Sequence, residues 1–269
     1  MGRIRKAFAG EKKPAFIGFT VAGDPDKATS IRIARALIEG GTDILELGVP
    51  FSDPVADGPT IQKADERALG TGTTPSTVFE IVREIRKESG VPIVLLTYYN
   101  IVLHRGIELF YREAHDTGVD GILIADMPIE ESEEVCLIAR QYDIDPIFLI
   151  SETTSDTRIK KIVAQARGYL YLVSVLGVTG VRNQVSGTAI DLLNRVRRHT
   201  PLPLAIGFGI STPIQAQAYT RAGVDGVIVG SAIVEIVERN LKDPDGMEHD
   251  LKAYVSTMKK AITGEQQDE

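Results

Sequence analysis

The chain has 269 residues, 43% of them hydrophobic, which is enough for one large domain with a substantial core. Its 30 basic and 37 acidic residues leave a net charge of −7, which argues against nucleic-acid binding. No apolar run approaches the roughly 18 residues that a membrane span requires. The basic N-terminus, Met1–Phe8, lacks the apolar core and cleavage site of a signal peptide. The single cysteine, Cys136, suits a reducing cytoplasm and is interpreted as a buried hydrophobe rather than a nucleophile. We therefore expect a cytoplasmic protein with no membrane or nucleic-acid partner.

Short apolar segments alternate along the chain with amphipathic ones. The predicted strands are, in chain order, Ala15–Val21, Asp43–Leu47, Ile93–Thr97, Gly121–Ala125, Pro146–Ile150, Tyr169–Ser174, Leu204–Ile206 and Gly226–Val229. The predicted helices are Lys27–Glu39, Ser76–Glu88, Ile107–Asp116, Glu130–Gln141, Thr157–Gln165, Ala189–His199, Pro213–Arg221 and Met247–Ile262. Alternation of this kind predicts a parallel sheet. About eight strand–helix units in about 250 residues favour a closed (β/α)8 TIM barrel over an open doubly wound sheet. We expect a single domain over residues 1–269, with an N-terminal helix within 1–12 and a frayed tail at 264–269.

One short pattern recurs at the junctions between helices and strands. The segments Thr117–Ile124 and Arg221–Ile228 are nearly the same sequence, and Gly40–Leu45 is a weaker copy. In each segment a glycine ends a helix, an aspartate lies in the turn, and an apolar strand follows. In such a barrel, function is found at the carboxyl ends of the strands and in the loops that follow them.

The predicted strand Asp43–Leu47 carries a carboxylate near its end. Side chains along a strand alternate between its two faces. If Leu45 and Leu47 pack outward against the helices, Glu46 points into the barrel at its catalytic end. Burial there would raise the pKa of Glu46 and suit it to act as both acid and base near neutral pH. A structural glutamate bonded to backbone amides is the alternative, and the position at the strand end favours the functional interpretation.

The loop after this strand is rich in proline and glycine and holds Asp53 and Asp57. A stiff loop can hold acids in fixed positions, as proton transfer requires. Asp57, which precedes Gly58 and Pro59, is equally suited to cap the helix that starts there. Asp53 is similarly suited to a turn ahead of Pro54. Spacing alone leaves both interpretations open for each residue.

Three glycine-rich segments follow the last three predicted strands: Leu176–Val181, Gly207–Ser211 and Val229–Val234. Glycine lets backbone N–H groups approach an anion, and a helix N-terminus adds favourable dipole charge. Phosphate in barrels commonly lies between the loops after strands seven and eight and the start of a short extra helix. Ser231–Glu238 is predicted to be that helix. Together the segments predict a phosphate-bearing ligand held mainly by backbone and hydroxyl groups. The longer polar loop Gly177–Thr188 is typical of a mobile lid.

The sequence lacks the residues that several other kinds of catalytic or binding site require. No lysine lies at a predicted strand end, which argues against a Schiff-base aldolase. The four histidines, His104, His115, His199 and His249, lack metal-ligand spacing. The chain shows no Ser–His–Asp or Cys–His set and no dinucleotide fingerprint. The sequence therefore predicts an enzyme that converts a phosphate ester with carboxylic acids as its catalytic groups. Such catalysis requires that the substrate itself accept the electrons of the breaking bond.

From about Phe16 to Ile262 the chain resembles the tryptophan synthase α subunit family, through motifs that occur in the family's order. These are Gly23-Asp24-Pro25, Glu46–Pro59 with Thr60-Ile61-Gln62, Thr97-Tyr98-Tyr99-Asn100, Ala125-Asp126-Met127-Pro128, Gly177-Val178-Thr179-Gly180, Gly207-Phe208-Gly209-Ile210-Ser211 and Val229-Gly230-Ser231-Ala232. The one departure noticed is Val21-Ala22 before Gly23, where many members carry threonine first. It affects no catalytic role.

The resemblance implies a carbon–carbon lyase that cleaves indole-3-glycerol phosphate to indole and glyceraldehyde 3-phosphate, without metal or cofactor. Protonation of the indole C3 turns the ring into the electron sink, and the C–C bond breaks as the side-chain hydroxyl loses its proton. By resemblance, Glu46 is the acid and base at these two positions, and Asp57 accepts the indole N–H and stabilises the charged ring.

The resemblance also implies roles for residues around these acids. Tyr169 and Tyr171 share a strand face with Val173, where core filling is the plain interpretation and ligand contact comes next for Tyr171. By resemblance Tyr171 orients the catalytic carboxylate or the substrate, and Thr179 on the lid contacts Asp57 on closure. The implied phosphate ligands are Gly180, Gly209, Gly230 and Ser231, and the implied indole pocket is lined by Phe19, Ile61, Tyr98 and Ala125.

In the family the α subunit pairs with a pyridoxal-phosphate β subunit in an α2β2 heterotetramer and passes indole to it. The implied partner surface includes the Pro50–Asp53 loop and the region of Pro128. Two alternatives are weighed against this prediction: a free-standing indole-releasing lyase, and a catalytically silent phosphate-binding barrel that regulates a partner. Retention of Glu46 and Asp57 argues against the silent barrel. The intact partner segments argue weakly against the free-standing lyase.

Overall fold

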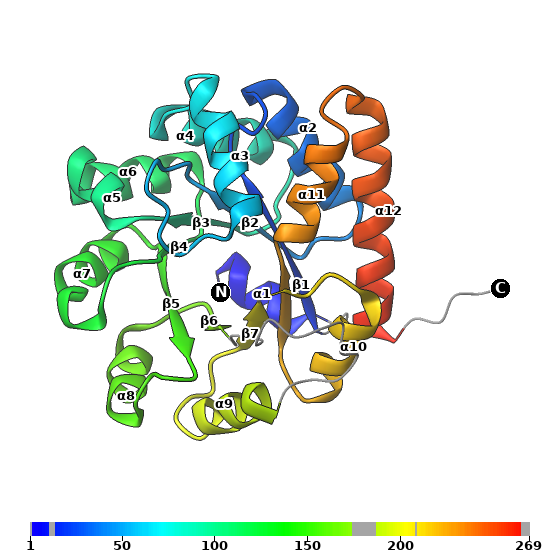
Figure 1. Ribbon diagram of the computed structural model, residues 1–269. Helices are drawn as coiled ribbons and strands as arrows, with labels where there is room; N and C mark the ends of the chain where they lie inside the picture. Colours follow the sequence, from blue (N-terminus) through cyan, green and yellow to red (C-terminus); the bar gives the residue numbers. More distant parts are fainter. Residues whose placement is uncertain (1, 11–13, 174–186, 208, 265–269) are drawn as a thin grey trace.

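In the computed structural model, which describes residues 2–10, 14–173, 187–207 and 209–264, parallel strands close into a barrel. Each strand pairs with the next along the chain, and the eighth pairs with the first (Figure 1). The strands are β1 (Ala15–Val21), β2 (Ile44–Gly48), β3 (Ile93–Thr97), β4 (Gly121–Ile124), β5 (Asp145–Ser151), β6 (Leu170–Val173), β7 (Leu204–Gly207) and β8 (Gly226–Val229). The predicted (β/α)8 barrel is therefore confirmed.

Helices surround the barrel and cover the outer faces of the strands (Figure 1). The helical elements of the described ranges are α1 (Arg3–Ala9), α2 (Lys27–Glu39), α3 (Pro59–Gly70), α4 (Pro75–Glu88), α5 (Tyr99–Arg105), α6 (Ile107–Thr117), η1 (Ile129–Glu131), α7 (Glu133–Gln141), α8 (Asp156–Gln165), α9 (Gly187–Arg197), α10 (Pro213–Arg221), α11 (Ser231–Arg239) and α12 (Pro244–Thr263). None of the helices in the described ranges is long and apolar enough to cross a membrane.

The helix boundaries differ from the predicted ones at two instructive places. The segment predicted as one helix over Glu130–Gln141 begins instead with the 3-10 turn η1 and restarts after Ser132. The Ser132 hydroxyl donates to the Ile129 carbonyl at 2.8 Å, so a side chain competes with the helical backbone at that point. Helix α5 was not predicted, because its 7 residues, about two turns that end before Gly106, are too few to show a helical period.

The amino-terminal end of the barrel is closed by α1. Its apolar side chains Ile4 and Phe8 are buried in the cluster that fills the barrel interior. The Phe8 ring lies 5.5 Å from the ring of Tyr169. Figure 1 shows α1 within the ring of strands. The opposite, carboxyl end of the barrel is therefore the end left for a ligand.

The repeated Gly-x-Asp pattern ties neighbouring strands together at the closed end. In all three copies the aspartate that precedes one strand accepts a backbone N–H at the start of the strand before it. The pairs are Phe16 with Asp43 at 2.6 Å, Ile93 with Asp120 at 2.9 Å, and Leu204 with Asp225 at 2.8 Å. Each carboxylate is also paired with a cation, from Lys259, Arg86 and Arg197 respectively. The pattern thus fixes the relative position of adjacent strands.

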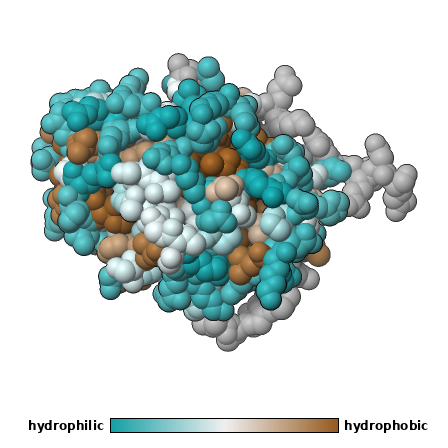
Figure 2. All heavy atoms as spheres, turned by 90° about the horizontal axis from the view of Figure 1, so that it is seen from above, coloured by the Kyte–Doolittle hydropathy of each residue, from teal (hydrophilic) through white to brown (hydrophobic). Residues whose placement is uncertain are grey.

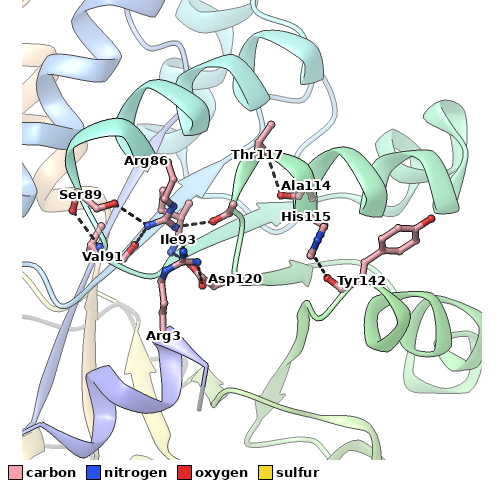
Figure 3. A network of polar contacts seen from close by, with 11 residues as sticks. Arg3, Arg86, Ser89, Val91, Ile93, Ala114, His115, Thr117, Asp120 and Tyr142 are labelled. Carbon is pink, nitrogen blue, oxygen red and sulfur yellow. Dashed lines mark hydrogen bonds and ion pairs between the residues drawn. The ribbon is translucent and has the colours of Figure 1, made fainter.

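Asp120 is the centre of the largest of these networks (Figure 3). Its two carboxylate oxygens each accept an arginine N–H at 2.9 Å, one from Arg3 of α1 and one from Arg86 of α4. Arg86 also donates to the carbonyls of Val91 and Gly118 at 2.6 and 2.7 Å. One acid therefore joins the N-terminal helix, α4 and the start of two strands.

The outer surface is mainly hydrophilic with smaller apolar patches, as Figure 2 shows for the face seen from above. Among the large hydrophobic side chains that the structure describes, Val55 is the most exposed, at 83%. Ile214 on α10 follows at 59%. Cys136 on α7 is buried and free, as the sequence predicted.

Candidate active site

A cavity of about 600 Å³ opens at the carboxyl end of the barrel. Its walls come from the ends of several strands, the loop after β2, and the start of α11. Among the predicted site residues it is lined by Phe19, Asp57, Ile61, Ala125, Tyr171, Gly209, Gly230 and Ser231. Thr179, Gly180 and most of the predicted lid, Gly177–Thr188, lie outside the described residues. The cavity also has an apolar wall that was not predicted, from Leu96, Leu149 and Ile228.

Glu46 lies inside the barrel below this cavity. Strand alternation buries Ile44 and Glu46 on the inner face of β2, and the Glu46 side chain is 1% exposed. Burial raises the pKa of Glu46 to about 7, against a smaller lowering effect of a hydrogen bond from the Tyr169 hydroxyl. That hydroxyl donates to Oε1, while Oε2 has no hydrogen-bond partner among the described residues. The carboxyl group can therefore hold or release a proton near neutral pH.

The tyrosine that touches Glu46 is Tyr169 and not Tyr171. Tyr169 immediately precedes β6, where its ring packs on Phe8 and its hydroxyl reaches Glu46. Tyr171 lies two residues further along the same inward face and lines the cavity instead. Gly207 leaves room for it, because a Cβ at Gly207 would lie 2.4 Å from the Tyr171 hydroxyl oxygen. Sequence alternation placed both tyrosines inward but could not tell which one reaches the acid.

Asp57 is held at the cavity wall by a tyrosine from another strand end. The Tyr98 hydroxyl donates to Asp57 Oδ2 at 2.6 Å and accepts the Ala56 N–H at 3.2 Å. The Tyr98 ring in turn stacks on Phe51, with centroids 5.1 Å apart. Burial raises the pKa of Asp57, and the Tyr98 hydrogen bond lowers it by less. The loop is thus braced so that one carboxylate faces the cavity.

The alternative interpretation of Asp57 as a helix cap is wrong. Helix α3 has Gly58 as its N-cap, with Pro59 at the first helical position and no side-chain capping bond. Asp53, in contrast, has the contacts of a turn residue: its carboxylate accepts the Ser52 hydroxyl at 2.6 Å, and its carbonyl accepts the Val55 N–H at 2.9 Å. The two acids of the loop therefore differ in their surroundings.

The other side of the cavity is suited to an anion. Gly209 has the left-handed φ of +68°, and Gly230 directly precedes α11. Ser231 begins α11, whose N-cap carries no side-chain hydrogen bond. The lining residues that the structure describes include no lysine or arginine, so backbone N–H groups and hydroxyls are the donors there. A Cβ at Gly230 would lie 3.1 Å from Phe19, so this glycine also makes room for the apolar wall.

Sequence reasoning missed one buried acid next to the site, Asp65 on α3. Its side chain is 3% exposed, and its Oδ2 has no partner in the described part of the chain. Burial and the nearby Asp57 raise the pKa of Asp65 to about 8. The only signal in the sequence is that Asp65 lies four residues after Ile61, on the apolar side of its helix. No group of three or more potential metal ligands occurs among the described residues.

Comparison with known proteins adds to this geometry. The family model of the tryptophan synthase alpha chain matches residues 6–263. The tryptophan synthase alpha chain of Methanoregula boonei is 69% identical over 261 residues, covering 97% of this chain and 98% of that protein. The one from Geobacter sulfurreducens is 46% identical, covering 97% of this chain and 99% of that protein.

Solved structures agree with the sequence relatives. The tryptophan synthase subunit alpha of Legionella pneumophila superposes with a TM-score of 0.90 at 33% identity, covering 98% of this chain and 99% of that one. A chain of the tryptophan synthase α2β2 complex of Pyrococcus furiosus superposes with a TM-score of 0.86 at 41% identity, covering 91% and 98%. The similarity extends over nearly the whole length of each chain. The chain therefore belongs to the tryptophan synthase alpha chain family, and it is a lyase.

Proposed function

We propose that the chain carries out the reaction of its family, cleavage of indole-3-glycerol phosphate to indole and glyceraldehyde 3-phosphate, with Glu46 as acid and base and Asp57 as electrostatic partner. The observation that supports these roles is that Asp57 lines a largely apolar cavity, while Glu46 is buried inside the barrel close enough to act on Tyr171, which lines the same cavity. Burial raises the pKa of both acids. Gly209, Gly230 and Ser231, which line the same cavity, form the part suited to a phosphate group. The apolar residues Phe19, Ile61 and Ala125 leave the indole ring a place between the two, and Tyr98 braces the Asp57 wall.

The chemistry follows from the protonation state of Glu46. With a pKa of about 7, a fraction of Glu46 is protonated near neutral pH and can donate its proton to indole C3. The indole nitrogen then carries positive charge, which Asp57 stabilises as it accepts the N–H. The resulting Glu46 carboxylate takes the proton of the side-chain hydroxyl. The electrons of the breaking C–C bond pass into the charged ring, indole leaves, and Glu46 is protonated again.

Other side chains hold the substrate in this geometry. Gly209, Gly230 and Ser231 offer backbone and hydroxyl donors to the phosphate group. Tyr171 faces the cavity and is proposed to contact the substrate. The family resemblance assigns Thr179 to Asp57 and Gly180 to phosphate, and both assignments remain predictions. In this scheme the catalyst consists of side chains only, and pyridoxal phosphate is expected only in the partner subunit.

A partner subunit is proposed to bind beside the same loop. The relative from Pyrococcus furiosus occurs in an α2β2 complex. In this chain Val55 projects from the loop with 83% of its surface exposed, and a neighbouring cavity of about 490 Å³ is lined by Phe51, Asn100 and Arg105 among others. Phe51 stacks on Tyr98, which holds Asp57, so contact of a β subunit with Phe51 would act on a catalytic acid through Tyr98. We propose the Pro50–Asp53 loop and the region of Pro128 as this surface, and the cytoplasm as the compartment.

The decisive experiment is to measure indole release from indole-3-glycerol phosphate by the purified chain and by Glu46→Gln, each with and without a β subunit. Slow release that the β subunit accelerates and that Glu46→Gln reduces at least a thousandfold supports the proposal. Fast release that the β subunit leaves unchanged would favour a free-standing lyase. No release from a folded chain that still binds glycerol phosphate would favour the silent regulatory barrel.

A further inference from the structure

Asp65 is a buried acid that the mechanism above does not use. It lies on the face of α3 that carries the buried residues Ile61, Ala64 and Ala68, and only 3% of its surface is exposed. A carboxylate at such a position is costly unless a cation or several donors compensate it. The structure supplies one donor, the backbone N–H of Phe51, and leaves Oδ2 without a partner among the described residues.

The charges around Asp65 are of the wrong sign to compensate it. Asp57 in the loop above and Asp24 after β1 both act on it with negative charge. The two cations nearest to Asp65 in sequence on its own helix are paired with other acids. Arg67 donates twice to Asp24, at 2.7 and 2.9 Å, and lies 3.8 Å from Glu238 of α11. Lys63 lies 3.3 Å from Glu238. Burial, together with these acids, raises the pKa of Asp65 to about 8, so the group keeps its proton at neutral pH.

The contact between Asp65 and Phe51 connects it to the catalytic loop. Phe51 stacks on Tyr98, and the Tyr98 hydroxyl donates to Asp57. We propose that Asp65 is a positioning residue of the lyase, whose protonated carboxyl group supports Phe51 and thereby keeps Tyr98 and Asp57 in the catalytic arrangement. This inference rests on the proposed role of Asp57.

Ionisation of Asp65 would undo this support. A second negative charge beside Asp57 would favour protonation of Asp57, and a charge without a counter-ion in an apolar site would favour displacement of the loop. Activity should therefore be lost as Asp65 loses its proton. This loss adds to the one expected when Glu46, the other buried acid near the cavity, loses its own proton at lower pH.

The test is the pH dependence of kcat/KM for indole release by the whole chain and by Asp65→Asn, in which an uncharged amide replaces the protonated acid. With two groups ionising, log kcat/KM of the unmodified chain should fall with a slope approaching two above pH 8. Asp65→Asn should match it at pH 6.5, fall with a slope of one, and be about tenfold more active at pH 9. The matched control is Glu66→Gln, one residue along the same helix and exposed, which should keep the steep fall.

Two results would overturn the proposal. One is an alkaline fall of slope two that persists in Asp65→Asn. The other is a tenfold loss of activity by folded Asp65→Asn at pH 6.5, where both side chains are uncharged. If the unmodified chain released no indole at any pH, the proposed function would fail, and the positioning role with it.

A second measurement tests whether Asp65 is protonated in the folded chain, independently of whether the chain releases indole. Because the pKa of Asp65 is higher in the folded chain than in the unfolded one, the unmodified chain should lose stability as pH rises from about 4 to about 8. Asp65→Asn should not show this loss, because its amide does not ionise. The Tm of Asp65→Asn should therefore exceed that of the unmodified chain by a margin that widens from pH 5 to pH 8 and then stays constant. A margin independent of pH would show that Asp65 does not hold a proton, whatever the activity.

Discussion

The Tyr98 hydroxyl donates a hydrogen bond to Asp57 Oδ2 at 2.6 Å, although the two residues belong to different strand–helix units. Tyr98 directly follows β3, whereas Asp57 lies in the loop between β2 and α3. Adjacent parallel strands bring their carboxyl ends side by side, so a residue after one strand can brace the loop of its neighbour. This contact accounts for the position of Asp57 better than any feature of its own loop.

Tyr98→Phe should lower kcat/KM for indole release about tenfold, because a hydrogen bond to a charged group is lost. The Tyr98 hydroxyl favours the ionised form of Asp57, so its removal should raise the pKa of Asp57 and move the acidic limb of the pH profile to higher pH. Tyr142→Phe, which removes an exposed hydroxyl bonded to Glu108 at 3.2 Å, is the control and should change neither quantity. An unmoved acidic limb in Tyr98→Phe would contradict the assignment of Asp57.

Tyr169→Phe should move the alkaline limb of the same profile upward. The Tyr169 hydroxyl stabilises the ionised form of Glu46, so without it Glu46 should keep its proton to a pH above about 7. Tyr171→Phe tests whether the effect belongs to Tyr169, since Tyr171 lines the cavity and should alter the rate while leaving that limb in place. The assignment fails if the two variants shift the limb equally.

Glu46→Gln should stabilise the fold at alkaline pH while it abolishes catalysis. The pKa of Glu46 is about 7 in the folded chain and about 4.5 when unfolded, so the unmodified chain loses stability as pH rises between these values. At about 1.4 kcal/mol for each tenfold change in ionisation constant, the full effect is on the order of 3 kcal/mol. Urea unfolding at pH 5 and at pH 8 measures it. A stability difference that is the same at both values would show that Glu46 is not a protonated acid in the resting chain.

Val55→Glu and Pro128→Glu should weaken activation by a β subunit without a change in the basal rate of the isolated chain. Pro128 lies at the proposed partner surface, and the exposed Val55 follows directly after its Pro50–Asp53 loop. A charge buried in an interface without a partner is unfavourable. Titration of indole release with β subunit gives the concentration needed for half activation, which should rise at least tenfold. Ile214→Glu, an equally drastic change on the exposed face of α10, should behave as the unmodified chain does. Equal loss of basal and activated rates would count against the surface.

Asp120→Ala should destabilise the barrel by about 3 kcal/mol, because it leaves the largely buried Arg86 without its acid. It also removes the acceptor of the Ile93 N–H. The control is Glu80→Ala, which breaks an ion pair with Lys27 of 2.5 Å whose two side chains are about half exposed. That change should cost far less stability than Asp120→Ala, because exposed ion pairs contribute little. Urea unfolding compares them, and similar costs would mean that the network does not tie the strands.

Much of the fold was predictable because apolar residues recur along the chain with the periods of strands and helices. Alternation within a strand requires no knowledge of other segments, so it placed Glu46 inside the barrel before any contact was known. The bounds of α2 and α10 also agree with the prediction, since each begins after a capping Asp26 or Thr212 and carries its own apolar period. The roles proposed for the phosphate ligands came from family resemblance and did not depend on periodicity.

The sequence by itself thus determined the barrel, its inward faces and the loop that carries the acids, because these depend on local periodicity and on turn-forming residues. Only the tertiary structure decided which groups meet. Asp57 proved to be bonded to Tyr98 and not a helix cap, and Tyr169 proved to be the tyrosine on Glu46. Asp65 proved to be buried beneath a loop. These outcomes depend on the register and closure of the barrel, which bring together residues tens of positions apart in the chain. The electrostatic surroundings of each acid, and so its protonation, arise only at that level.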